Sequence, residues 1–214
     1  ALVAGGSLGG MVTLELCATR PDAARAAIVF AAPASPTAWG SAWNHVHRTA
    51  IEAAPRSGLA LARMVGMLTY RTPLEVERRF RPHGPGTHPV RDYLNHHGEK
   101  LVRRFTTKAY LTLLDAIDAH DVARGRGSVR RALGAFRGSL LGVGIPGDLL
   151  YPPAEVRRWT RASGAGYREL ASPSGHDGFL LETDAVGALL AEALGGKTGE
   201  PEALQPPRLQ PSAF

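Results

Sequence analysis

The feature that most constrains this chain is a serine flanked by glycines close to its beginning. An apolar run at residues 2–4 precedes the pattern Gly5-Gly6-Ser7-Leu8-Gly9, and a helix-compatible segment at about residues 11–20 follows it. Strand, tight turn and helix in this order are the context in which Gly-x-Ser-x-Gly marks a nucleophile elbow. Because such a turn strains the serine backbone, we expect both Gly5 and Gly9 to be required for steric reasons. The alternative interpretation is a glycine-rich surface turn.

The composition is that of an ordinary globular protein. The chain has 214 residues, of which 44% are hydrophobic and 21% charged, enough for one hydrophobic core. No apolar run approaches the roughly 20 residues that a membrane span needs. No secretory signal pattern is visible, and the single cysteine, Cys17, excludes an internal disulfide and fits a reducing compartment. We therefore expect a cytoplasmic protein that does not contact a membrane.

The net charge of +6 raises the question of a nucleic-acid partner. The basic residues are scattered among acidic ones, and no zinc-finger, basic-helix or RNA-recognition pattern accompanies them. We expect no nucleic-acid partner, and only a modest attraction for an anionic substrate.

Strand-like and helix-like segments alternate at both ends of the chain. Residues 26–32 form a run that is apolar on both faces, as a buried parallel strand requires, and residues 139–145 and 167–170 are similar short segments. Helical patterns at residues 152–159 and 184–194 follow the last two strands. This alternation predicts an α/β fold with a mainly parallel sheet.

The middle of the chain has no strand pattern and predicts a helical insert. Apolar residues recur at helical spacing in residues 59–68, 74–80, 93–105 and 110–122. We expect an α/β core made of residues 1–36 and 128–195, a helical lid at 37–127 and a disordered tail at 196–214.

Two downstream residues favour the elbow over the surface turn. An elbow serine needs a base to accept its proton and a carboxylate to orient that base. Asp148 follows the third predicted strand and His176 follows the fourth, so the order Ser7, Asp148, His176 is that of an α/β-hydrolase triad. Taken singly, Asp148 is equally a helix cap and His176 one of eight histidines. The other seven histidines lie in the predicted lid, where we expect structural or solvated roles.

Six sequence blocks make this interpretation more specific. They are residues 5–11 (GGSLGGM), 62–64 (ARM), 98–105 (GEKLVRRF), 118–122 (DAHDV), 148–153 (DLLYPP) and 172–177 (SPSGHD). In this order, from Ala1 to about residue 194, they resemble the homoserine O-acetyltransferase family, whose members are acyltransferases of the α/β-hydrolase fold. The resemblance implies transfer of an acetyl group from acetyl-CoA, as co-substrate, to the hydroxyl of L-homoserine, in methionine biosynthesis. It also implies a homodimer formed through the lid, and no bound cofactor or metal.

The resemblance assigns roles to individual residues. Ser7 attacks the thioester, His176 carries the proton, and the Leu8 N–H donates to the oxyanion in a ping-pong scheme. For the homoserine zwitterion, Asp177 meets the ammonium group and Arg63 the carboxylate, with Tyr70 as a hydrogen-bonding neighbour. Without the resemblance, Arg63 is more simply a solvated charge and Tyr70 a packing aromatic.

The chain also departs from the family pattern. It lacks sequence before the elbow strand, and with it further strands and the loop that supplies a second oxyanion donor, so we expect an N-terminally truncated chain whose own activity is in doubt. The alternatives are a related acyltransferase that uses succinyl-CoA or L-serine, a serine hydrolase or esterase, and a non-catalytic fragment. The charged pair Arg63 and Asp177 argues against the hydrolase, since an ester substrate does not require it.

Overall fold

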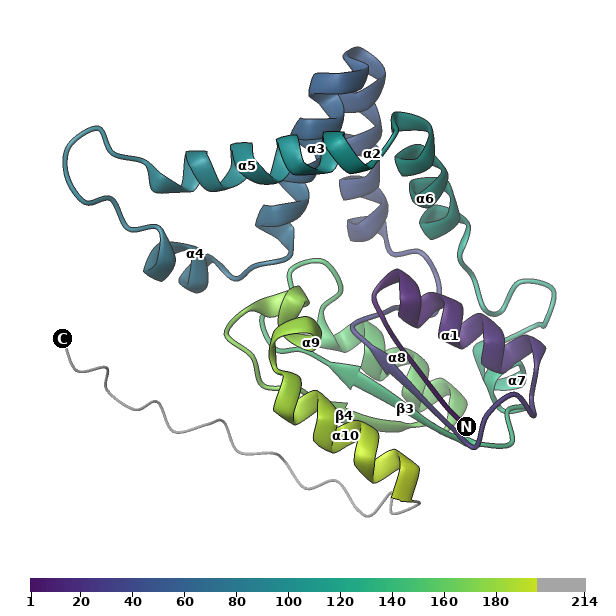
Figure 1. Cartoon of the computed structure of the whole chain (residues 1–214). Coiled ribbons are helices and arrows are strands. Elements are labelled where there is room, and N and C mark those ends of the chain that lie inside the picture. Colours follow the sequence, from purple (N-terminus) through teal and green to yellow (C-terminus); the bar gives the residue numbers. More distant parts are fainter. Residues whose placement is uncertain (196–214) are drawn as a thin grey trace, which may run out of the picture.

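The computed structural model describes residues 1–195, and the tail predicted at 196–214 lies outside them. Four parallel strands form one sheet in the order β1-β2-β3-β4 (Figure 1). The strands are β1 (Leu2–Gly6), β2 (Ala26–Phe30), β3 (Ser139–Gly144) and β4 (Gly166–Glu169). Each lies within two residues of its predicted position, and the α/β prediction is confirmed.

Helices cover both faces of this sheet. Side chains alternate along β2, so Ala27 and Val29 join the core under one set of helices while Ile28 and Phe30 join the core on the other face. The first face is covered by α1 (Leu8–Thr19), α7 (Val129–Leu133) and α8 (Pro153–Ser163). The second is covered by α9 (Gly178–Leu181) and α10 (Thr183–Gly195). Burial on both faces explains why β2 is apolar throughout.

A group of helices inserted between β2 and β3 stands over one end of the core (Figure 1). It consists of α2 (Ala38–Ala53), α3 (Pro55–Thr69), α4 (Pro73–Arg79), α5 (Pro89–Arg104) and α6 (Thr107–Ala119). We call these five helices the lid. None of the helices in residues 1–195 combines the length and hydropathy needed to cross a membrane.

Helix α2 has no counterpart among the predicted elements. Most of the residues that it buries are small or polar rather than apolar, so no apolar helical pattern reveals it; they are Gly40, Asn44, His47 and Ile51. Helix α2 packs very closely on α3. A Cβ atom at Gly58 on α3 would lie 1.8 Å from the carbonyl oxygen of Ala50 on α2. The two helices therefore meet backbone to backbone, and Ile51, Leu59 and Ala62 form a separate apolar core within the lid.

Candidate active site

Ser7 occupies a strained turn between β1 and α1. Its backbone angles are φ 54° and ψ −125°, a left-handed conformation that residues other than glycine rarely adopt. Its N–H donates to the carbonyl oxygen of Phe30 at the end of β2 (2.9 Å), and its own carbonyl accepts from Met11 to begin α1 (3.0 Å). These bonds hold the serine where strand becomes helix, the geometry of a nucleophile elbow.

The glycines around Ser7 are not equivalent. A Cβ atom at Gly5 would lie 2.2 Å from the carbonyl oxygen of Gly9, and one at Gly6 would lie 2.3 Å from the ring of Phe179. A Cβ at Gly9 meets no atom of the described residues within 4 Å. The expectation that Gly9 must lack a side chain is therefore wrong. Gly9 constrains Gly5 through its carbonyl oxygen, whereas a Cβ on Gly9 itself points into open space.

Asp148 and His176 form a buried hydrogen-bonded pair. Asp148 Oδ2 lies 2.7 Å from Nδ1 of His176, and the side chains are 0% and 3% exposed. The second carboxylate oxygen accepts the N–H groups of Leu150 (2.8 Å) and Tyr151 (2.9 Å). A carboxylate fixed in this way favours the tautomer with a proton on Nδ1 and leaves Nε2 free to act as a base.

The fold brings this pair to the same edge of the sheet as the serine. Parallel strands end at one edge, and Ser7, Asp148 and His176 follow β1, β3 and β4 in turn. Asp148 does not cap the next helix, because α8 begins at Pro153 with Pro152 as its N-cap. The ring of Phe179 links elbow and histidine: it packs against Gly6 and stands edge-on to His176 with centroids 5.8 Å apart.

Two lid residues with predicted substrate roles lie above His176. The Tyr70 ring centroid is 5.6 Å from that of His176, and the guanidinium carbon of Arg63 is 5.7 Å from the Tyr70 ring centroid. Burial raises the pKa of Tyr70, an effect that Arg63 opposes, so its hydroxyl stays protonated as a donor. Arg63, Tyr70 and His176 thus form a continuous series from lid to core.

Asp177 is already paired in this structure. Its Oδ2 lies 3.1 Å from Nη2 of Arg71, and its N–H donates to the Tyr70 carbonyl oxygen at 3.2 Å. Burial raises the pKa of the Asp177 carboxyl and Glu75 adds to the rise, while Arg71, His176 and Arg63 lower it. The sequence reasoning missed Arg71, whose only signal was an acidic residue four positions on, at Glu75.

The loop that carries His176 is bound to the lid at a second point. The Thr72 hydroxyl donates to the carbonyl oxygen of Pro173 at 2.6 Å, and it also accepts the N–H of Glu75 at 3.1 Å. Residues 70–72 therefore connect the end of α3 and the start of α4 directly to the histidine loop.

The role of the Leu8 N–H as an oxyanion donor stays a prediction. Leu8 is the first residue of α1, and the first N–H groups of a helix have no partner within it. A donor here combines with the positive end of the helix dipole beside the Ser7 hydroxyl.

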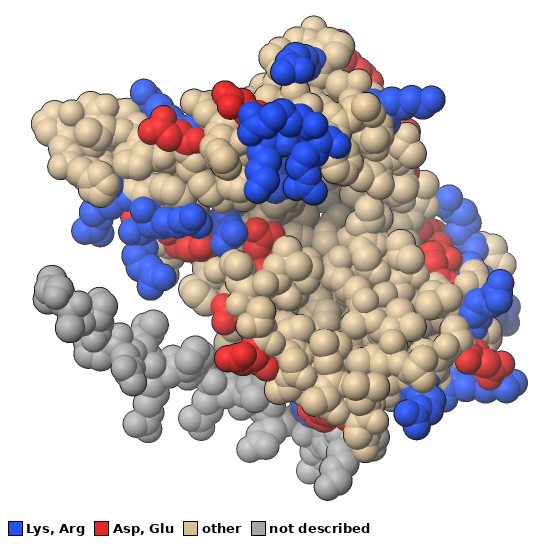
Figure 2. Space-filling model, in the orientation of Figure 1, with Lys and Arg blue, Asp and Glu red and all other residues tan. Residues whose placement is uncertain are grey.

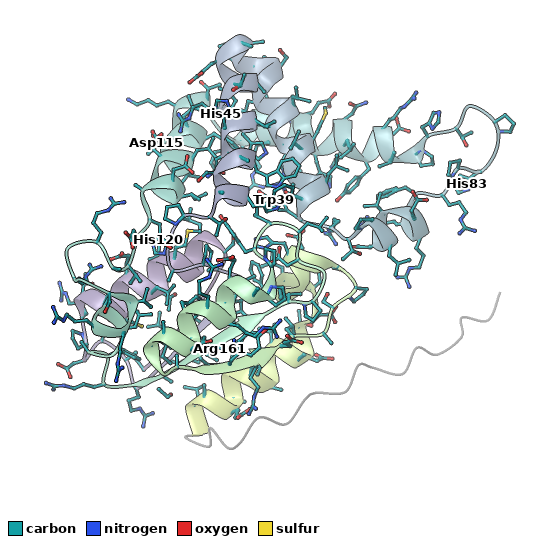
Figure 3. All side chains as sticks on the ribbon, turned by 180° about the vertical axis from the view of Figure 1, so that it is seen from behind. Trp39, His45, His83, Asp115, His120 and Arg161 are labelled. Carbon is teal, nitrogen blue, oxygen red and sulfur yellow. The ribbon has the colours of Figure 1, made fainter. Side chains whose placement is uncertain are left out.

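The remaining histidines are distributed over the lid and its junction with the core. His45 and His83 lie on the lid, whereas His120 lies where the lid meets the core (Figure 3). His120 is buried with Nε2 3.2 Å from the Pro33 carbonyl oxygen, and His47 is buried with Nδ1 3.2 Å from the Tyr110 hydroxyl. Basic side chains gather over the lid and along one margin of the core, while the middle of the core face in the same view carries few (Figure 2).

One hollow in the described residues lies away from the residues of the candidate site. A cavity of about 800 Å³ is lined by the start of β3, the segment between α8 and β4, and Arg168 and Glu192. None of Ser7, Asp148 and His176 lines it. Within residues 1–195, no three His, Cys, Asp or Glu side chains are grouped to hold a metal ion.

Comparison with known proteins agrees with the resemblance seen in the sequence. No family model matches the chain. It is 46% identical over 201 residues to the homoserine O-acetyltransferase of Thermus thermophilus, covering 89% of this chain and 52% of the relative. It is 39% identical over 224 residues to the enzyme of that name from Clavibacter michiganensis, covering 91% and 58%. The chain thus spans about half the length of the curated relatives it matches.

Superposition on solved structures identifies the fold. The homoserine O-acetyltransferase of Staphylococcus aureus superposes with a TM-score of 0.78 at 34% identity, covering 93% of this chain and 60% of that one. The acetyl esterase MekB superposes with a TM-score of 0.80 at 22% identity, covering 91% and 61%, and shows the fold alone. The α/β-hydrolase fold predicted from the sequence is confirmed.

Proposed function

We propose that this chain carries the nucleophile, acid and base of an acyltransferase that moves an acetyl group from acetyl-CoA to the hydroxyl of L-homoserine, in methionine biosynthesis. The observation that carries the proposal is the Asp148–His176 pair at the strand ends, joined through Phe179 to the elbow of Ser7. The relatives named homoserine O-acetyltransferase, at up to 46% identity, indicate which acyl transfer this arrangement performs.

The first half-reaction acylates the serine. Nε2 of His176 takes the Ser7 proton while the serine oxygen attacks the thioester carbonyl, and the Leu8 N–H donates to the oxyanion. The C–S bond then breaks, the leaving CoA sulfur receives the proton from His176, and an acetyl ester remains on Ser7. Asp148 holds the imidazole in the tautomer that accepts and returns this proton.

The second half-reaction transfers the acetyl group. His176 takes the proton of the homoserine hydroxyl, whose oxygen attacks the ester carbonyl. The bond to the Ser7 oxygen breaks, the serine regains its proton from His176, and O-acetylhomoserine leaves. Water performing the same attack makes the protein a hydrolase.

Three charged or polar side chains favour an amino-acid acceptor over water. Arg63 is a cation for the carboxylate, Tyr70 is a half-buried donor beside it, and Asp177 is an anion for the ammonium group. Tyr70 packs on the His176 ring, Arg63 lies over the Tyr70 ring, and Asp177 follows His176 in the chain. The homodimer through the lid is a further proposal from the same resemblance, and a cytoplasmic location is a proposal from the sequence composition.

Release of free thiol tests the proposal. Purified protein is given acetyl-CoA with and without L-homoserine, and released CoA is followed with a thiol-reactive dye. We expect sustained release that depends on homoserine and disappears in Ser7→Ala. Release indifferent to homoserine indicates a hydrolase. Release with succinyl-CoA alone, or with L-serine alone as acceptor, identifies the related transferases.

A further inference from the structure

A cation lies between two carboxylates beside the histidine loop. Arg71 Nη1 is 2.9 Å from Oε1 of Glu75, and its Nη2 is 3.1 Å from Oδ2 of Asp177. The three side chains are only 13%, 13% and 16% exposed, so solvent screens their charges weakly. We call these three residues the Arg71 cluster.

The charges of the cluster do not cancel. Arg71 and Asp177 alone form a neutral pair, which leaves no net charge to attract an ammonium group. Glu75 adds a second negative charge, so the cluster as a whole carries one net negative charge. Glu75 Oε1 and Asp177 Oδ2 bind different nitrogens of the guanidinium, so Arg71 is shared between two anions.

The cluster also contains unused hydrogen-bonding capacity. Among the described residues, Glu75 Oε2 and Arg71 Nε are buried atoms with no hydrogen-bond partner. A buried acceptor without a donor is unfavourable. A cationic ligand with N–H donors supplies the hydrogen bond that Glu75 Oε2 lacks.

The cluster lies beside the loop that carries His176, on the side of the lid residues with predicted acceptor roles. Asp177 adjoins His176 in the chain, and Arg71 adjoins Tyr70, whose carbonyl accepts the Asp177 N–H. The other groups that face Asp177 are Arg63 from α3, His176 itself, and Tyr93 from α5, whose pKa responds to Arg71, Asp177 and Glu75. In the described part of the chain, the ion pairs and hydrogen bonds of the cluster do not involve Ser7.

We infer that Arg71 and Glu75 are positioning residues of the acceptor subsite: Arg71 orients Asp177, and Glu75 offsets the charge of Arg71 so that the subsite selects acceptors that carry an ammonium group. This inference rests on the proposed function and extends it from Asp177 to the two residues that control its charge.

The decisive variant is Glu75→Gln, which keeps the shape of the side chain and removes its charge. We expect the KM for L-homoserine to rise at least about tenfold, from the loss of one charge interaction in a partly buried site. Acylation of Ser7 by acetyl-CoA, measured as the first burst of thiol, should change less than about twofold. The preference for homoserine over the deaminated hydroxy acid, which keeps the hydroxyl and carboxylate, should fall in parallel.

The pH profile supplies a second readout that a structural role does not produce. Glu75 raises the pKa of Asp177, so Glu75→Gln should lower that pKa. The increase in acceptor KM on acidification then begins at a lower pH in the variant than in the parent protein. Glu77→Gln, the same change at an exposed position of α4, is the matched control and should alter neither readout.

Further variants keep the inference testable if Glu75→Gln folds poorly. Glu75→Asp retains the charge and should restore most of the preference for homoserine, and Arg71→Lys should raise acceptor KM without slowing the burst. An unchanged homoserine KM in Glu75→Gln, or an equal loss in both half-reactions, overturns the inference. A parent protein whose thiol release ignores homoserine instead overturns the proposed function.

Discussion

Oδ2 of Asp148 lies 2.7 Å from Nδ1 of His176, and both side chains are buried. The carboxylate is itself fixed by two backbone N–H groups, so the imidazole has one favoured tautomer and orientation. That relationship joins residues that follow separate strands, and it is the basis for the chemistry proposed for Ser7.

Replacing Asp148 by Asn should leave the fold intact and remove most of the activity. The amide oxygen still accepts the N–H groups of Leu150 and Tyr151, but the amide no longer stabilises the imidazolium or enforces the tautomer. We expect kcat to fall by about 10⁴-fold. Steady-state thiol release together with circular dichroism checks this, and a fall of less than about tenfold contradicts the orienting role of Asp148.

Replacing the glycines on the two sides of Ser7 by alanine should have opposite effects on the unfolding free energy. Gly5→Ala forces a Cβ against the backbone of Gly9 and should cost about 1–3 kcal/mol of unfolding free energy. Gly9→Ala meets open space near the start of α1, where alanine is favoured over glycine by about 0.5–1 kcal/mol. Urea unfolding of both variants checks the contrast. Equal destabilisation contradicts the elbow geometry described for Gly5.

Arg63→Lys should weaken acceptor binding while leaving acylation of Ser7 unaffected. Lysine keeps the charge but loses the planar fork that grips a carboxylate. We expect the homoserine KM to rise by a factor equivalent to about 1–2 kcal/mol. Arg56→Lys, at an exposed position of the same helix, is the control. A reduced acylation burst in Arg63→Lys contradicts an acceptor-only role.

The buried His47 should make the lid sensitive to acid. Burial lowers the pKa of His47 from 6.5 to about 4, so between these values the unfolded state binds more protons than the folded state. The stability contributed by neutral His47 is complete above pH 6.5 and is lost as the pH falls toward 4, by about 3 kcal/mol at most.

Thermal unfolding of the parent and of His47→Gln at a series of pH values measures this effect. The difference in stability between the two proteins should shrink on acidification. His45→Gln, at an exposed position on the same helix, should follow the parent at every pH. A His47→Gln variant that loses stability in acid as steeply as the parent contradicts the assignment.

Sequence patterns predicted the sheet because the relevant signals are local. Apolar runs bounded by glycine and proline mark β2 and β3, and the order in which Ser7, Asp148 and His176 follow their strands needs no knowledge of distances. The positions of Arg63 and Tyr70 came instead from family resemblance, because nothing local separates a lid arginine from a solvated one.

Other features depend on contacts that sequence patterns do not encode. Helix α2 packs closely on α3 through a face that is largely small or polar, which an apolar pattern does not mark. Arg71 was missed because its partner Asp177 lies far along the chain, across the junction of lid and core. The error at Gly9 has the same origin, because the direction in which a Cβ would point there is set by the turn and not by residue type.

The central claim, that Ser7 carries the acyl group, is tested most directly by trapping the intermediate. Protein is incubated with acetyl-CoA in the absence of homoserine, quenched in acid, digested, and the peptide containing Ser7 is examined by mass spectrometry. We predict one added acetyl group on Ser7, absent from His176→Ala and discharged from the parent when homoserine is added before the quench. Thiol release without acetylation of Ser7, or an acetyl group that homoserine fails to remove, contradicts the account.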